Sequence, residues 1–152
     1  MLDDIVKIVE AANKALKIEE RELYISPHEQ KGLYSIKCEN KIMEYVHENT
    51  PLSSVLCDIT HAVINILKQK YEDIHAQTWE GVSENTFFVN GWIDNIHYGF
   101  SWTVFLNGEK VIIEEWWENG RRKRTEMSIE EYFETLVGII LLIRQVSKSD
   151  LQ

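Results

Sequence analysis

Residues 96–108 have the sequence IHYGFSWTVFLNG. Every even position from Ile96 to Leu106 is apolar, whereas the odd positions are mostly small or polar. An apolar residue at every second position is typical of a β-strand with one buried face. The pair Asn107-Gly108 that follows is a preferred two-residue hairpin turn, and Asn119-Gly120 is another. The stretch therefore predicts antiparallel strands joined by short turns.

A third, weaker turn signal at Asp94-Asn95 extends this pattern to an antiparallel meander of four to five strands over about residues 73–126. If all three turns have two residues, Trp102 pairs with Phe87 on one side and with Ile113 on the other. One sheet face then collects apolar residues, which are Phe87, Val89, Ile93, Ile96, Tyr98, Phe100, Trp102, Val104, Leu106, Val111 and Ile113. We expect helices to cover this face.

Three amphipathic segments predict an N-terminal helix over residues 2–16, a central helix to about residue 70 and a C-terminal helix to about residue 146. Thr50 and Pro51 predict an N-cap and first helical position for the central helix, and Ser128 and Glu131 predict a capping box for the last one. The block 136–143 is apolar on all sides, so the last helix should be deeply covered.

The segments 22–26 and 33–38 predict short strands, whereas residues 41–46 fit either a third strand or one helical turn. The chain contains no internal repeat and no proline-rich linker that would mark a second domain. We therefore expect residues 1–152 to form a single α+β domain, with the N-terminal, central and C-terminal helices packed on one face of the meander.

The composition excludes several classes of protein. The 152 residues include 25 acidic and 16 basic side chains, for a net charge of -9, and only two cysteines. This balance argues against a disulfide framework and against nucleic-acid binding. The longest apolar run has eight residues, so we expect no membrane association, and Asp3 and Asp4 argue against a signal peptide. We expect a cytoplasmic protein.

The negative charge is concentrated in the middle of the chain. Residues 71–120 carry nine acidic side chains against one basic side chain, Lys110, so their net charge is -8. The same region holds all five tryptophans. An acidic, aromatic surface steers a protein towards cationic partners and offers anchors for binding them.

The second face of the predicted sheet mixes aromatic, polar and acidic residues. One interpretation is that this face binds a basic protein, or a second copy of the chain, because aromatic residues are enriched at interfaces. The candidate partner-binding residues are Trp92, His97, Phe105, Glu114, Trp116 and Glu118. The alternative is that the first helix or the early strands cover this face, and the sequence leaves both open.

The basic run 121–124 lies next to the turn Asn119-Gly120. A two-residue turn there pairs Glu118 with Arg121, Trp117 with Arg122 and Glu115 with Arg124. We expect a hairpin that neutralises its own charges instead of a free basic patch for nucleic acid.

Cys57 and His61 share one face of the central helix and could form a thiolate-imidazole pair or half of a zinc site. No further ligand follows at metal spacing, so a buried thiol beside a surface histidine is the simpler reading. The other histidines are dispersed, and only His97 projects from the aromatic face. The sequence contains none of the common nucleotide, hydrolase or metal motifs. We expect no catalytic residue, no metal and no cofactor.

These observations favour a non-catalytic protein-binding module, most simply an acidic inhibitor or immunity protein that neutralises a basic toxin such as a nuclease. Two alternatives stay open. One is a secretion-type chaperone that forms a dimer, and the other is a small-ligand-binding protein or enzyme with a pocket between the helices and the sheet, for which His97 and Tyr98 are the hints.

Overall fold

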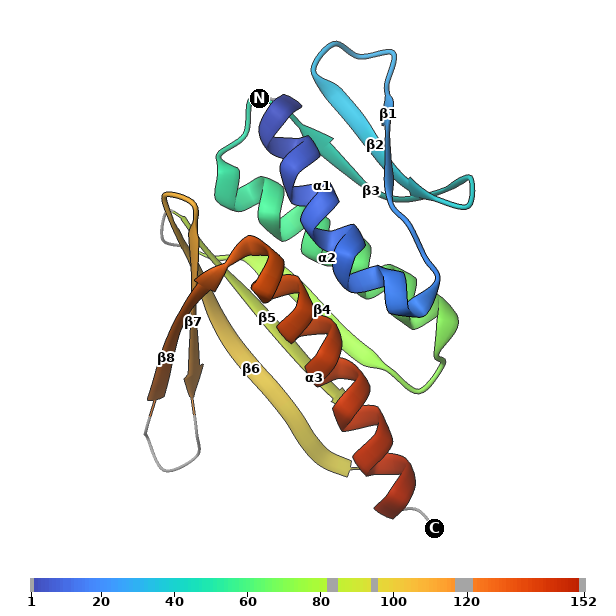
Figure 1. The fold of residues 1–152 in the computed structure, drawn as a ribbon, viewed down its shortest axis with the longest axis vertical. Helices are drawn as coiled ribbons and strands as arrows, with labels where there is room; N and C mark the ends of the chain where they lie inside the picture. The colour runs from blue at the N-terminus through green and yellow to red at the C-terminus, as the bar shows by residue number, and fades with distance from the viewer. Residues whose placement is uncertain (1, 82–84, 94–95, 117–121, 151–152) are drawn as a thin grey trace.

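The computed structural model describes residues 2–81, 85–93, 96–116 and 122–150, and within them it forms three α-helices and two antiparallel sheets (Figure 1). The first sheet has the strand order β1-β2-β3 and the second has the order β4-β5-β6-β7-β8. The elements are α1 Leu2–Leu16, η1 Lys17–Glu19, β1 Tyr24–Pro27, β2 Leu33–Cys38, β3 Lys41–His47, α2 Leu52–Lys70, β4 His75–Glu80, β5 Thr86–Ile93, β6 Ile96–Asn107, β7 Lys110–Trp116, β8 Arg122–Ser128 and α3 Ile129–Asp150. The predicted α+β class and the meander are confirmed.

Helix α2 lies between the two sheets, with β3 on one side and β4 on the other (Figure 1). Helices α2 and α3 pack on one face of the five-stranded sheet, while α1 lies mainly against α3 and α2. The hydroxyl groups of Thr60 and Tyr132, both fully buried and 2.8 Å apart, join α2 to α3. The predicted placement of helices on one face of the meander is confirmed.

The core lies between this sheet face and the helices. The sheet contributes fully buried side chains at every second position, as the alternation predicts. They are Phe87, Val89, Trp102, Val104, Val111 and Ile113. Helix α3 contributes Tyr132, Phe133 and Leu136, but Leu142 in its apolar block is 57% exposed. The expectation that this helix is covered on all sides is therefore wrong.

The three-stranded sheet shows that residues 41–46, which the sequence left ambiguous, belong to a strand. Glu39 and Asn40 connect β2 to β3 with φ values of 50° and 67°. Two successive residues with positive φ form a tight hairpin turn, and asparagine tolerates that conformation well. A bulge opposite Ile36 and Lys37 then lets Met43 turn into the core, where it is 5% exposed.

The register of the meander differs from the prediction by two residues. Trp102 pairs with Val89 and Glu115, whereas Val104 pairs with Phe87 and Ile113. The β6–β7 turn is the cause, because Asn107 already pairs with Lys110 and leaves residues 108 and 109 as the turn. An irregularity at Trp92 and Ile93 shifts β5 against β6 by the same amount. A shift of two residues keeps each side chain on its predicted face.

The helix caps were predicted correctly at one of two places. The backbone N–H of Glu131 donates to the hydroxyl of Ser128 at 3.1 Å, and this hydroxyl donates to the Glu131 carboxylate, so Ser128 caps α3 as predicted. The Thr50 hydroxyl instead donates to the carbonyl of His47, and Pro51 precedes α2 without a side-chain cap. Among the described residues, no helix is long and apolar enough to cross a membrane.

Candidate protein-binding face

The outward side chains of β4–β8 form a surface that we term the outer face. Strand pairing places on it His75, Gln77 and Trp79 from β4, Phe88, Asn90 and Trp92 from β5, Ser101, Thr103 and Phe105 from β6, Lys110, Ile112 and Glu114 from β7, and Arg122, Arg124 and Glu126 from β8. In the described part of the chain no helix packs on it, because α2 and α3 occupy the opposite face. The alternative that the first helix or the early strands cover this face is wrong, since they pack on the helices.

Two tryptophans stand out on the outer face. Trp79 is 43% exposed and Trp92 is 41% exposed. The ring of Trp79 lies against that of Phe88 with centroids 5.5 Å apart, whereas Trp92 pairs with His75 at the other end of the β4–β5 ladder. Because both rings belong to paired strands with a full hydrogen-bond ladder, the sheet holds them in fixed positions. The face thus offers rigid aromatic area at its β4–β5 side.

Glu114 has a different environment from the one expected. Its side chain is buried, it accepts a hydrogen bond from Arg124 at 3.5 Å, and it forms an ion pair with Arg122 at 3.6 Å. Arg124 also lies 5.9 Å from the centre of the Phe105 ring. The register explains this cluster, because Glu114 and not Glu115 pairs with Arg124, one residue away from the prediction. Within the described residues, Glu114 is the carboxylate that pairs with both Arg122 and Arg124.

The predicted binding residues therefore have unequal positions. Trp92 is exposed and Phe105 is half-buried on the outer face, whereas Glu114 is buried beneath two arginines. The side chains of His97 and Trp116 and the whole of Glu118 lie outside the described residues, as does the predicted pair of Glu118 with Arg121. Arg122 pairs with Trp116 and not, as predicted, with Trp117. Sequence reasoning missed Trp79, although the alternation of residues 75–80 places it on the same face as Trp92.

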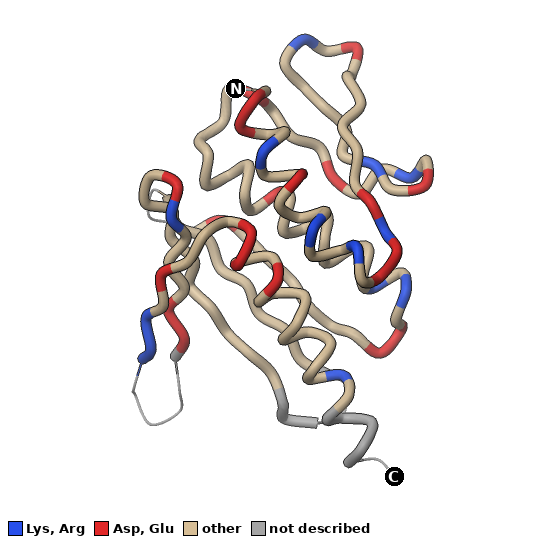
Figure 2. The backbone as a smooth tube through the Cα atoms, viewed as in Figure 1, with Lys and Arg blue, Asp and Glu red and all other residues tan. Residues whose placement is uncertain are grey.

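The described charges of the outer face are nearly balanced. Three basic side chains, Lys110, Arg122 and Arg124, accompany two acidic ones, Glu114 and Glu126. The face is aromatic, as predicted, but in its described part it is not acidic. Figure 2 shows acidic residues instead at the start of α1, along the first turns of α3 and at the β6–β7 turn.

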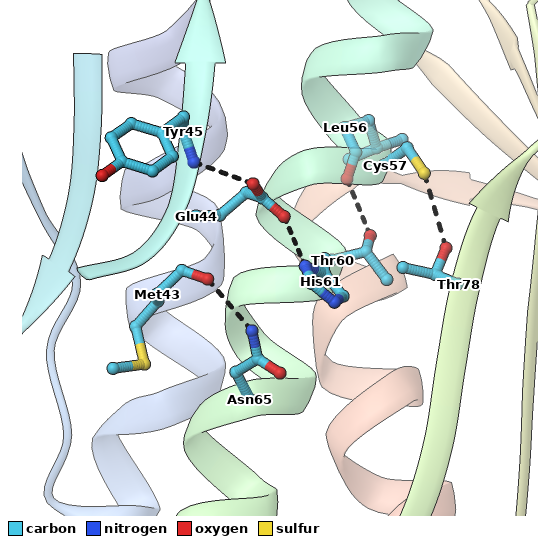
Figure 3. A network of polar contacts seen from close by, with 9 residues as sticks. All are labelled: Met43, Glu44, Tyr45, Leu56, Cys57, Thr60, His61, Asn65 and Thr78. Atoms are coloured by element: carbon cyan, nitrogen blue, oxygen red, sulfur yellow. Dashed lines mark hydrogen bonds and ion pairs between the residues drawn. The ribbon is translucent and has the colours of Figure 1, made fainter. Parts of the chain in front are cut away.

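The Cys57–His61 pair does not form. His61 Nδ1 is hydrogen-bonded to Glu44 of β3, and the Asn65 amide donates to the carbonyl of Met43 at 3.0 Å, so both side chains tie α2 to the three-stranded sheet (Figure 3). The hydrogen bond to Glu44 raises the pKa of His61 despite partial burial. Burial opposes ionisation of Glu44, but the bonds from His61 and from the Tyr45 N–H hold its pKa below the ordinary value.

Cys57 points to the other sheet, where its sulfur lies 3.5 Å from the hydroxyl of Thr78 (Figure 3). That hydroxyl donates to the carbonyl of Phe88, so it accepts from the thiol. Burial raises the pKa of Cys57 to about 11, and a protonated thiol is a poor nucleophile. Within the described residues no group of three or more histidine, cysteine or acidic side chains could hold a metal ion.

Neighbouring Asp58 has a strongly raised pKa. Burial, together with the carboxylates of Glu44 and Glu80, raises its pKa to about 7, and His61 offsets part of this rise. Half-buried carboxylates that repel one another behave in this way. When Asp58 ionises near neutral pH, its carboxylate is therefore repelled by those of Glu44 and Glu80.

The chain matches no family model, no curated protein and no solved structure. Its function has to be inferred from the geometry of its own surfaces.

Proposed function

We propose that this chain is a non-catalytic protein-binding module that acts in the cytoplasm as an inhibitor or immunity protein of a basic protein, such as a nuclease toxin. The single observation that carries the proposal is that Trp79 and Trp92 are each more than 40% exposed on a sheet face left open by the described helices. Large aromatic side chains held on a rigid sheet are typical anchors of protein interfaces.

The physical argument concerns both affinity and rate. A tryptophan buries a large apolar area on binding, and its fixed position on a sheet reduces the entropy lost. The net charge of -9 attracts a basic partner over a longer range and speeds association. Since the described outer face is nearly balanced in charge, the attraction comes from acidic groups elsewhere on the molecule, and the aromatic rings supply the contact.

The non-catalytic part of the proposal is supported by the environments of the reactive side chains. Cys57 is protonated and hydrogen-bonded to Thr78, and His61 is engaged by Glu44. Both contacts hold α2 between its two neighbouring sheets. An inhibitor acts by occupying its target, which needs no nucleophile or base.

The test is parallel affinity capture from the native host with the unchanged chain, Trp79→Ala, Trp92→Ala and Ile18→Ala, quantified by mass spectrometry. Ile18 is the matched control, because it is 86% exposed and lies on η1, away from the outer face. We expect a basic protein, first sought among those encoded next to this chain, that the two tryptophan variants fail to retain. The purified pair should then show a Kd raised at least about tenfold by either substitution and unchanged in Ile18→Ala.

The proposal also requires that binding abolishes the partner's own activity in solution. Equal capture by all four chains would overturn the choice of this face. Sedimentation that finds a stable dimer which Trp92→Ala separates would instead assign the face to a second copy, as the chaperone alternative requires.

A further inference from the structure

A groove of about 490 Å³ follows α1 on the helix side. Its first wall is one face of α1, from Asp4 to Lys14. The opposite wall consists of Ser128, Ile129 and Glu130 at the start of α3, together with Glu109 in the β6–β7 turn. In Figure 1 α1 and the start of α3 lie on the helix side of the five-stranded sheet, and the groove reaches the edge of that sheet at Ser128 and in the β6–β7 turn.

The floor of the groove is apolar. Leu52 at the start of α2 and Ile129 at the start of α3 are partly exposed there, beside the buried Ile8 of α1. The volume falls within the range of roughly 300 to 1,000 Å³ that is typical of ligand pockets. Along α1 the wall extends for ten residues, or roughly 15 Å, which matches a short peptide segment better than a compact metabolite.

The rim of the groove is acidic. The groove is lined by four carboxylates and two ammonium groups. The carboxylates are those of Asp4, Glu10, Glu109 and Glu130, and the ammonium groups are those of Lys7 and Lys14. Lys14 is already paired with Glu130 at 2.8 Å, and this hydrogen bond, with Glu10 and Glu134 nearby, raises its pKa. The excess of carboxylates makes the rim complementary to a cationic occupant, and the floor makes the groove complementary to an apolar one.

We propose that this groove is a second docking site, and that it takes a lysine- or arginine-rich segment of a partner protein that also carries apolar side chains. The apolar side chains of the partner segment pack on Leu52 and Ile129. Its cationic side chains form ion pairs with Glu10 and Glu109 on opposite walls of the groove. The proposal does not rest on the outer face, because neither Trp79 nor Trp92 lines the groove.

The experiment uses the full chain and a synthetic amphipathic peptide of leucine and lysine. Binding is measured by fluorescence anisotropy of the labelled peptide and is mapped by amide chemical shifts of the isotope-labelled chain. Two further peptides serve as comparisons. One has glutamate in place of lysine, and the other has glutamine in place of leucine. We expect the first peptide to bind much more tightly than both, with shifts along α1 and at residues 128–130.

The matched pair of variants is Glu10→Gln with Glu109→Gln, and Glu29→Gln with Glu39→Gln. Each removes two negative charges from exposed side chains, but only the first removes them from the groove. We expect the first variant to raise the Kd of the peptide roughly tenfold and the second to leave it within about twofold.

Three results would overturn the proposal: equal losses in the two variants, equally tight binding of the glutamine peptide, or shifts confined to β4–β8. Either of the first two results would mean that the peptide is attracted by the net charge of the whole protein and not bound in the groove. The outer-face proposal would survive all three, because its test depends on Trp79 and Trp92.

Discussion

The indole of Trp92 stacks on the imidazole of His75 across β5 and β4, with ring centroids 5.9 Å apart and planes inclined by 17°. The same tryptophan covers Gly99 of β6, its paired residue on the other side. Trp92 is thus part of the sheet as well as a candidate anchor for a partner, and the two roles can be separated by experiment.

We expect Trp92→Ala to lower the free energy of unfolding by about 1 to 2 kcal/mol, because it removes a stacked pair and the cover of a glycine. Urea denaturation followed by circular dichroism measures this change. His75→Ala should reproduce the part that comes from stacking and leave partner binding nearly intact. A fully stable Trp92→Ala would contradict the structural role and leave only the binding role.

Gly99 is required by the close approach of two strands. A Cβ atom there would lie 2.5 Å from the carbonyl oxygen of Gly91, which belongs to the backbone and cannot rotate away. We expect Gly99→Ala to cost about 1 to 3 kcal/mol in thermal unfolding. Gly138→Ala is the control, since a Cβ there meets nothing within 4 Å and alanine favours a helix, so this variant should be more stable than the parent. Equal effects of the two substitutions would refute the close approach.

Asp58 makes stability depend on pH near neutrality. Because its pKa rises from 3.8 to about 7 on folding, the folded state holds the proton more tightly than the unfolded state. The contribution of Asp58 to the free energy of unfolding is fully present below about pH 4 and is lost as the pH rises through 7. We expect Asp58→Asn to be more stable than the parent at pH 8, by on the order of 1 kcal/mol after allowance for partial exposure. The two chains should unfold alike at pH 4, and a constant difference across pH would contradict the assignment.

The Glu44–His61 contact stabilises the fold within a window of pH. Because the pKa of His61 is raised on folding, its contribution to the free energy of unfolding is fully present below pH 6.5. Because the pKa of Glu44 is lowered, its contribution is fully present above pH 4.5. We expect Glu44→Gln to destabilise the protein most between these values, by roughly 0.5 to 1 kcal/mol. Above this window the loss should shrink, because His61 becomes neutral while Glu44 still repels Asp58. Thermal unfolding at pH 5.5 and pH 9 measures the difference, and an equal loss at both values would rule out an ionic contact.

The faces of the meander were predictable from the sequence, although its pairs were not. Side chains alternate with period two, so a two-residue slip at Asn107 and Gly108 left Trp102 and Val104 in the core. The slip occurred because local sequence does not decide which two residues form the turn. At β7–β8 the slip was one residue, so Arg124 pairs with Glu114 and not with the predicted Glu115.

The position of an acidic residue in the sequence did not predict where its charge lies on the folded protein. Glu114 and Glu115 are adjacent, yet alternation sends them to opposite faces, and only Glu114 is buried by arginines. The acidic rim of the groove combines Glu10, Glu109 and Glu130, which are far apart in sequence. Such a cluster arises only when α1 packs beside α3.

The packing of α1 against α3 also sets an order of events during synthesis. Lys14 and Glu130, which join these helices, are 116 residues apart. At a translation rate of about 5 to 20 residues per second, α1 waits roughly 6 to 23 seconds for its partner to be made. The meander can assemble in that interval from neighbouring hairpins, whereas the apolar stripe of α1 has only α2 to cover it. The ribosome therefore delivers α3, which completes the core, after the other described elements, and a chain that stalls before residue 129 presents this stripe to chaperones and proteases.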